Sequence, residues 1–118
     1  MKATELLIPA VRQYRHNSTK VLINATQTVR ERVVHLRRLM LVHSYIYYWM
    51  DSSVVSDHQW QAWANSLRDL QTLFGWEGFG YFDLTFKGWD GSTGCDLPQD
   101  PRMVDKARWL VQEHDRLS

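Results

Sequence analysis

The spacing of apolar and aromatic residues between positions 29 and 50 constrains the fold of this chain more than any other feature. They follow one another at alternating intervals of four and three residues, and this interval puts them on one face of an amphipathic helix. Thr28 and Glu31 have the spacing of a capping box, so we expect the helix to begin directly after Thr28. The residues of this first stripe are Val29, Val33, Leu36, Met40, His43, Tyr47 and Met50.

A second stripe follows a short break. Asp51-Ser-Ser interrupts the first stripe, and Ser56 with Gln59 offers another capping box. So short a connection makes two helices antiparallel neighbours, and the sequence therefore predicts a helical hairpin over residues 29–74. The residues of the second stripe are Trp60, Trp63, Leu67, Leu70 and Phe74.

Residues 75–100 have a different character, because six glycines punctuate them. Between the glycines, Tyr81–Phe86 has the composition of a short strand. Asp100-Pro101 is typical of a helix start, with a capping carboxylate followed by proline in the first turn. A C-terminal helix over residues 101–117 is expected, with a stripe made of Met103, Ala107, Leu110 and Leu117.

The first 28 residues leave two alternatives open. Leu6–Ile8 and Val21–Ile23 suit short strands, which could pair with Tyr81–Phe86, or parts of a first helix. A chain of 118 residues forms one domain with a modest core. The predicted fold class is α+β, mainly helical: a helical hairpin, a small glycine-rich strand and loop region, and a C-terminal helix.

Composition narrows the function classes. The net charge is only +1, which gives no bulk attraction to nucleic acid or membrane, although residues 1–50 are basic and residues 51–118 acidic. The single Cys95 excludes an internal disulfide framework and suits a reducing cytoplasm, and no apolar run is long enough to span a membrane. The five histidines have no recognisable metal-ligand spacing, so we expect neither a metal site nor a cofactor.

The predicted turn between the two helices gathers aromatic rings and carboxylates. Tyr47, Tyr48 and Asp51 lie at the end of the first helix, and Asp57 and Trp60 at the start of the second. Rings beside acidic groups suit a flat, polar or cationic ring as ligand. The alternative is that Tyr47 and Trp60 are core rings at the helix seam and that Asp57 only caps a helix.

The same stretch resembles a known module. Tyr45-Ile-Tyr-Tyr-Trp-Met-Asp51, a five-residue turn and Asp57-His-Gln-Trp-Gln61 are similar to the N-terminal helical domain Ia of NAD-dependent DNA ligases. Trp60 replaces a tyrosine of that pattern, and Gln61 replaces an aspartate. The resemblance covers residues 29–74 and implies that Tyr47, Tyr48, Asp57 and Trp60 hold the nicotinamide mononucleotide half of NAD. A looser resemblance is to small bacteriophage proteins in which a ligase-like hairpin precedes an Asp-Gly-Ser-Thr-Gly segment, here 90–94.

Two further groups are candidates for phosphate contact. Arg37 belongs to a basic helix with Arg30, Arg32 and Arg38, which is either a solvated face or a phosphate-binding one. Asp90, Ser92 and Thr93 lie between glycines in a loop whose amides and hydroxyls could converge on an anion or form only a turn.

Catalysis is not expected from this sequence. Lys87-Gly-Trp-Asp90-Gly91 has one residue too many for the Lys-x-Asp-Gly of the ligase adenylation site, and no nucleophile motif accompanies the Ser, His and Asp residues. We therefore predict noncatalytic binding of nicotinamide mononucleotide, NAD or an ADP-ribose derivative, by sequestration or sensing. In a virus such a binder would capture an NAD-derived immune signal. The alternative is a module whose aromatic and basic surface binds a protein or nucleic acid.

Overall fold

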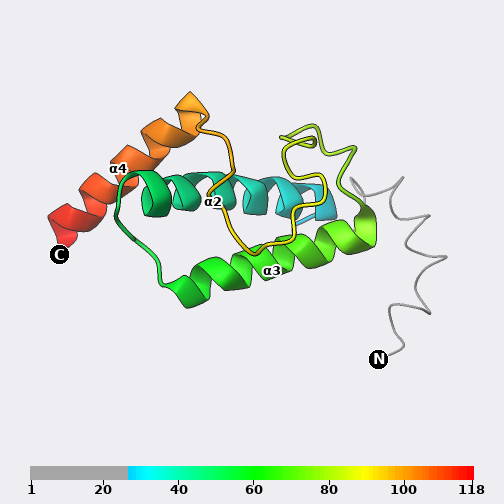
Figure 1. The fold of residues 1–118 in the computed structure, drawn as a ribbon, viewed down its shortest axis with the longest axis horizontal. Helices are drawn as coiled ribbons and strands as arrows, with labels where there is room; N and C mark the ends of the chain where they lie inside the picture. Colours follow the sequence, from blue (N-terminus) through cyan, green and yellow to red (C-terminus); the bar gives the residue numbers. More distant parts are fainter. Residues whose placement is uncertain (1–26) are drawn as a thin grey trace.

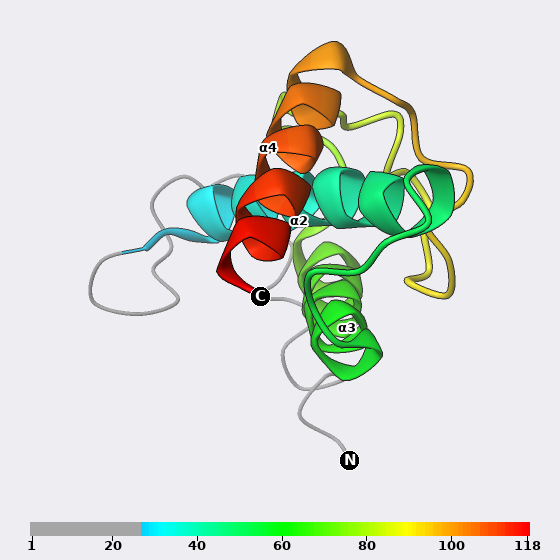
Figure 2. The same ribbon diagram turned by 90° about the vertical axis from the view of Figure 1, so that its left-hand side faces the viewer.

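The computed structural model describes residues 27–118, which form three helices joined by irregular segments. The helices are α2 (Val29–Trp49), α3 (Asp57–Phe74) and α4 (Pro101–Leu117). The chain reverses direction between α2 and α3, and α4 packs on α2 from another side (Figure 1). Figure 2 shows α4 crossing in front of α2, with α3 below α2. The predicted hairpin and C-terminal helix are confirmed, whereas Leu6–Ile8 and Val21–Ile23 lie outside the described residues.

The helix starts follow from local hydrogen bonds. The Glu31 backbone N–H donates to Thr28 Oγ1 (3.1 Å), and the Thr28 N–H donates to Glu31 Oε1 (2.9 Å), which completes the capping box of α2. At α3 the Gln59 N–H donates to Ser56 Oγ (3.0 Å). Asp100 caps α4. Each cap satisfies a backbone donor that has no partner inside its helix, which is why the sequence located all three starts.

The core lies where the stripes of the three helices meet on α2. The first stripe is enclosed along most of its length but emerges at its end, since Tyr47 is 54% exposed. On α4, Leu117 is also exposed and does not belong to the packed stripe. Burial of the other apolar side chains of the three stripes is the main driving force for the fold. The buried residues that the helices contribute include Val29, Val33, Leu36 and Met40 of α2, Ala64 and Leu67 of α3, and Met103 and Ala107 of α4.

The strand predicted at Tyr81–Phe86 is wrong, and with it the β part of the predicted fold class. No residue between 27 and 118 belongs to a strand, and residues 83–88 form successive tight turns after a bend at 81–82. The Phe86 N–H donates to the Phe82 carbonyl (3.2 Å), and the Trp89 N–H donates to the Phe86 carbonyl (3.2 Å). Phe82 also has a positive φ of 60°, which no strand tolerates. The described residues are therefore all-helical with irregular connections.

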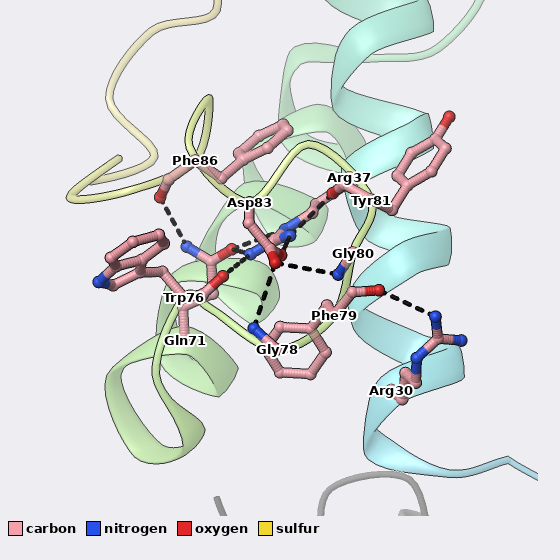
Figure 3. A network of polar contacts seen from close by, with 10 residues as sticks. All are labelled: Arg30, Arg37, Gln71, Trp76, Gly78, Phe79, Gly80, Tyr81, Asp83 and Phe86. Carbon is pink, nitrogen blue, oxygen red and sulfur yellow. Dashed lines mark hydrogen bonds and ion pairs between the residues drawn. The ribbon is translucent and has the colours of Figure 1, made fainter.

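A buried arginine organises this irregular segment (Figure 3). Arg37 of α2 is fully buried, and its guanidinium donates five hydrogen bonds. Nε and one terminal nitrogen donate to Gln71 Oε1 of α3 (2.9 and 2.7 Å). The remaining bonds reach Asp83 Oδ1 (2.6 Å) and the carbonyls of Trp76 (2.6 Å) and Tyr81 (2.8 Å). A guanidinium has five N–H donors, so every donor of Arg37 is used inside the protein.

Asp83 extends the same network to the glycine turns. Its Oδ2 accepts the backbone N–H of Gly78 (3.2 Å) and of Gly80 (3.0 Å). Burial works to raise the pKa of the Asp83 carboxyl, but hydrogen bonds from Arg37 and Gly80 outweigh it and hold that pKa below its ordinary value. Arg37 is thus neither on a solvated face nor free to bind phosphate, because its charge is neutralised and its donors are occupied.

The length and composition of a helix decide whether it can cross a membrane. Among residues 27–118 no helix combines the length and the apolar character needed to cross a bilayer.

Candidate functional site

A cavity of about 190 Å³ opens at the turn of the hairpin, between the end of α2 and the start of α3. Its lining includes Tyr47 and Tyr48 from α2, and Asp57 and Trp60 from α3. These four residues are the core of the site that the sequence suggested, and the fold brings all four together. The helix reversal is the reason, since it places the last turn of α2 beside the first turn of α3.

The two tyrosines form one side of the cavity. Tyr47 and Tyr48 have ring centroids 4.9 Å apart with planes at 87°, an edge-to-face pair. Both rings are substantially exposed, 54% for Tyr47 and 42% for Tyr48. Exposed aromatic faces beside a cavity leave apolar surface available to a ligand.

The indole of Trp60 is held by three contacts. Its Nε1 donates to the buried Ser44 Oγ (3.3 Å). Its ring meets Trp89 edge to face, with centroids 6.3 Å apart. Gly94 lies against both Ser44 and Trp60, so closely that a Cβ at this position would overlap Ser44. Trp60 is therefore a fixed wall of the cavity, with its orientation set by neighbours from α2 and from the glycine-rich loop.

The loop after Trp89 braces both sides of the cavity. Thr93 Oγ1 shares a hydrogen bond with the Tyr48 hydroxyl (2.9 Å), and the Thr93 carbonyl accepts from Trp89 Nε1 (2.9 Å). Gln61 Nε2, from the cavity lining, donates to the Gly91 carbonyl (3.1 Å). Thr93 thus supports the site through Tyr48, although it is not one of the residues lining the cavity.

Asp90 and Ser92 bond to one another. Asp90 Oδ1 accepts from the Ser92 backbone N–H (2.9 Å) and from Ser92 Oγ (2.7 Å). The hydrogen bonds from the Ser92 side chain and backbone lower the pKa of the Asp90 carboxyl. The amide and hydroxyl of Ser92 therefore serve a local turn, and neither Asp90 nor Ser92 is among the residues lining the cavity.

The carboxylates at the turn separate into two kinds. Asp57 is the first residue of α3 and lines the cavity, where the positive end of the helix dipole favours a negative charge. Asp51 lies outside the lining and has a left-handed φ of 48° directly after α2. The Ser52 N–H turns back to the Ile46 carbonyl there (3.2 Å), so the place of Asp51 is explained by helix termination.

His43 also lines the cavity, although its position in the first stripe predicts only a core residue. It is 8% exposed, and its ring lies against Trp63 at 5.2 Å. Its Nδ1 is buried and has no hydrogen-bond partner in the described part of the chain. Burial lowers the pKa of His43, which favours a neutral imidazole. The sequence feature that could have indicated this role is the presence of a histidine in an otherwise apolar stripe.

A second, more open hollow lies towards the other end of α3. It measures about 320 Å³, and its lining includes Arg68, Trp76, Trp89 and Asp90. Asp90 is thus the one predicted site residue that lies here. Lys87 Nζ stands 5.2 Å from the Trp76 ring centroid, a cation–π contact.

Residues 27–118 hold no group of three or more His, Cys, Asp or Glu side chains placed to hold a metal ion. Cys95 is free and exposed. The groups at the cavity are instead rings, one carboxylate and neutral polar side chains. Side chains of these kinds can stack on an organic ring and form hydrogen bonds to its edge.

No protein-family model, curated protein or solved structure matches this chain.

Proposed function

We propose that the chain binds an NAD-related nucleotide without catalysis: nicotinamide mononucleotide, NAD or an ADP-ribose derivative, with a flat ring of the ligand in the cavity. The observation that carries this proposal is the convergence of Tyr47, Tyr48, Asp57 and Trp60 on one cavity. Aromatic faces attract a cationic pyridinium ring, and Asp57 adds a negative charge beside it. The resemblance of residues 29–74 to ligase domain Ia supplies the ligand class.

The size of the cavity limits how much of the ligand it takes. About 190 Å³ is smaller than the roughly 300–1,000 Å³ of sites that enclose a drug-sized ligand. One ring fits inside, and the ribose and phosphate extend outside towards solvent. Arg37 supplies no phosphate contact in this arrangement because its five donors bond within the protein. Recognition is concentrated on the ring, which suits a noncatalytic binder.

The test is calorimetry with nicotinamide mononucleotide, NAD and ADP-ribose. Trp60→Ala and Asp57→Asn should each weaken the binding of nicotinamide mononucleotide by about 1–3 kcal/mol. This is the scale of a ring contact or of a charged hydrogen bond. Trp109→Ala and Asp105→Asn are matched controls, because both residues are exposed on α4, far along the chain from the hairpin turn. Asn at position 57 keeps the side-chain size, and circular dichroism checks the fold.

Other results would change the conclusion. Equal losses in the control variants would show a nonspecific effect of removing rings or charges. ADP-ribose binding as tightly as NAD, with no binding of nicotinamide mononucleotide, would assign the cavity to adenine. Chromatography of NAD after incubation with the protein tests turnover, and accumulating products would make the chain an enzyme. Absence of binding at millimolar concentration rejects the proposal.

One observation favours a second candidate, a macromolecular partner surface. Tyr47, Tyr48 and Trp49 are consecutive and all exposed, Trp49 by 56%. Exposed aromatic side chains are frequent at the centres of protein interfaces. Trp49→Ala separates the two candidates, because Trp49 does not line the cavity. Loss of a partner without loss of nucleotide binding would support this second function.

A further inference from the structure

His43 is the polar group whose presence packing does not explain. It occupies a stripe position between Met40 and Tyr47, where the inner neighbours are apolar, and it is 8% exposed. Its ring contacts the ring of Trp63. Among the described side chains, Nδ1 of His43 is the one buried nitrogen or oxygen atom without a hydrogen-bond partner.

An unpartnered buried nitrogen costs stability. Buried polar groups in native proteins are nearly always hydrogen-bonded, and the exceptions often have a functional reason. A phenylalanine has almost the same ring size and could make the contact with Trp63 without an unsatisfied nitrogen. The imidazole is therefore kept for something that it does beyond filling the core.

The second ring nitrogen provides that role. Nε2 forms no hydrogen bond within the described residues. Unlike Nδ1, it is not fully buried, so it is accessible from outside the core. Since His43 lines the cavity, the small exposed part of its ring has access to solvent there. A neutral imidazole carries one donor and one acceptor, so it can bond to either an N–H or a carbonyl of a ligand.

We infer that His43 hydrogen-bonds the edge of the ring that enters the cavity, and that this edge carries a carboxamide rather than a carboxylate. The inference rests on the proposed function and names the ligand class within it. Either tautomer of a neutral imidazole can bond through Nε2 to a carboxamide, whereas only the tautomer with the proton on Nε2 can bond to a carboxylate. Asp57 lines the same cavity and repels a second negative charge. Nicotinamide nucleotides are accordingly favoured over nicotinic acid nucleotides.

The experiment measures affinity and stability on the same variants. Calorimetry compares nicotinamide mononucleotide with nicotinic acid mononucleotide for the parent protein, His43→Phe and His43→Gln. Expected are a preference of about tenfold or more for the amide in the parent and a loss of about tenfold for that nucleotide in His43→Phe, the scale of one hydrogen bond. His43→Gln places an amide near the position of Nε2 and should keep more of the affinity than His43→Phe.

The melting temperature without ligand distinguishes a ligand-binding histidine from a structural one, because replacing a structural histidine would lower it. His43→Phe should melt at the parent temperature or above it, because the unsatisfied nitrogen is gone. If the larger ring prevents folding, His43→Leu gives the same comparison with a smaller side chain.

The outcomes separate two failures. A parent that binds neither nucleotide overturns the proposed function, and the role of His43 falls with it. A parent that binds nicotinamide mononucleotide while His43→Phe or His43→Leu binds it equally well overturns only the role of His43. Equal affinity of the parent for the amide and the acid overturns the assigned ligand class.

Discussion

Arg37 and His43 are both buried polar residues of α2, but their surroundings differ completely. All five donors of Arg37 have partners, drawn from α3 and from the glycine-rich segment. His43 has an unpartnered Nδ1 and lies on a cavity. A polar cluster with every partner present fixes the fold, whereas an imidazole with no internal partner beside a cavity can offer its accessible Nε2 to a ligand. The degree of satisfaction therefore distinguishes structural from candidate functional groups on the same helix.

Arg37→Met should give the largest effect. It leaves Asp83 without its cation and removes the donors to Gln71 and to two carbonyls, so we expect a loss of about 3–5 kcal/mol in denaturant unfolding. Arg38→Met is the control, because Arg38 is exposed and only stacks on Tyr81. That change should cost about 1 kcal/mol or less. Similar losses for the two variants would show that the buried network does not hold the segment.

Gly94→Ala tests the brace behind the candidate site. The added methyl overlaps Ser44, the residue that fixes Trp60, so we expect a loss of about 1–3 kcal/mol from overpacking. Ser44→Gly removes both overlapping atoms. Unfolding of the double variant should therefore show less than the summed losses of the single variants. Additive losses would mean that Gly94 and Ser44 do not meet in solution.

The pH dependence of stability gives a smaller effect at His43. Burial lowers the pKa of His43 in the folded state, while the unfolded chain takes up this proton near pH 6.5. The unfolded state thus binds more protons as pH falls from about 6.5 towards the folded pKa, and stability decreases over that window. The contribution of His43 to the change of unfolding free energy with pH cannot exceed the limit for one proton, about 1.4 kcal/mol per pH unit.

His43→Phe should remove this part of the pH dependence. Denaturant titrations at several pH values measure the stability of both proteins. His35→Gln is measured as well, because burial and the charges of Arg32 and Arg38 also lower the pKa of His35, which therefore adds to the same pH dependence. Asp83 adds a loss at lower pH, since its pKa is depressed and its protonation breaks the contact with Arg37. If the parent and His43→Phe have the same profile between pH 5 and 7, then His43 is not buried in the neutral form.

Much of the fold was predictable from the sequence because its signals are local. The stripe on α2 and the caps at Thr28, Ser56 and Asp100 depend on residues within four positions of one another. The antiparallel hairpin follows from two such stripes and a short turn. Four residues of the candidate site could be named for the same reason, since they lie at the two ends of that turn.

What the sequence could not give depends on residues far apart in the chain. Tyr81–Phe86 has the composition of a strand, yet Arg37, more than forty positions earlier, draws the Tyr81 carbonyl into a turn (2.8 Å). Nothing near Arg37 indicates that it is buried, because its partners Gln71 and Asp83 lie on other segments.

Sequence by itself therefore determined the three helices, their starts and the hairpin that gathers the aromatic residues. Only the tertiary structure decided which polar residues are satisfied and which are left open. Helix periodicity and capping are set by hydrogen bonds between near neighbours. The roles of Arg37, Thr93 and His43 are set instead by partners brought together, or kept away, when the glycine-rich segment packs against α2 and α3.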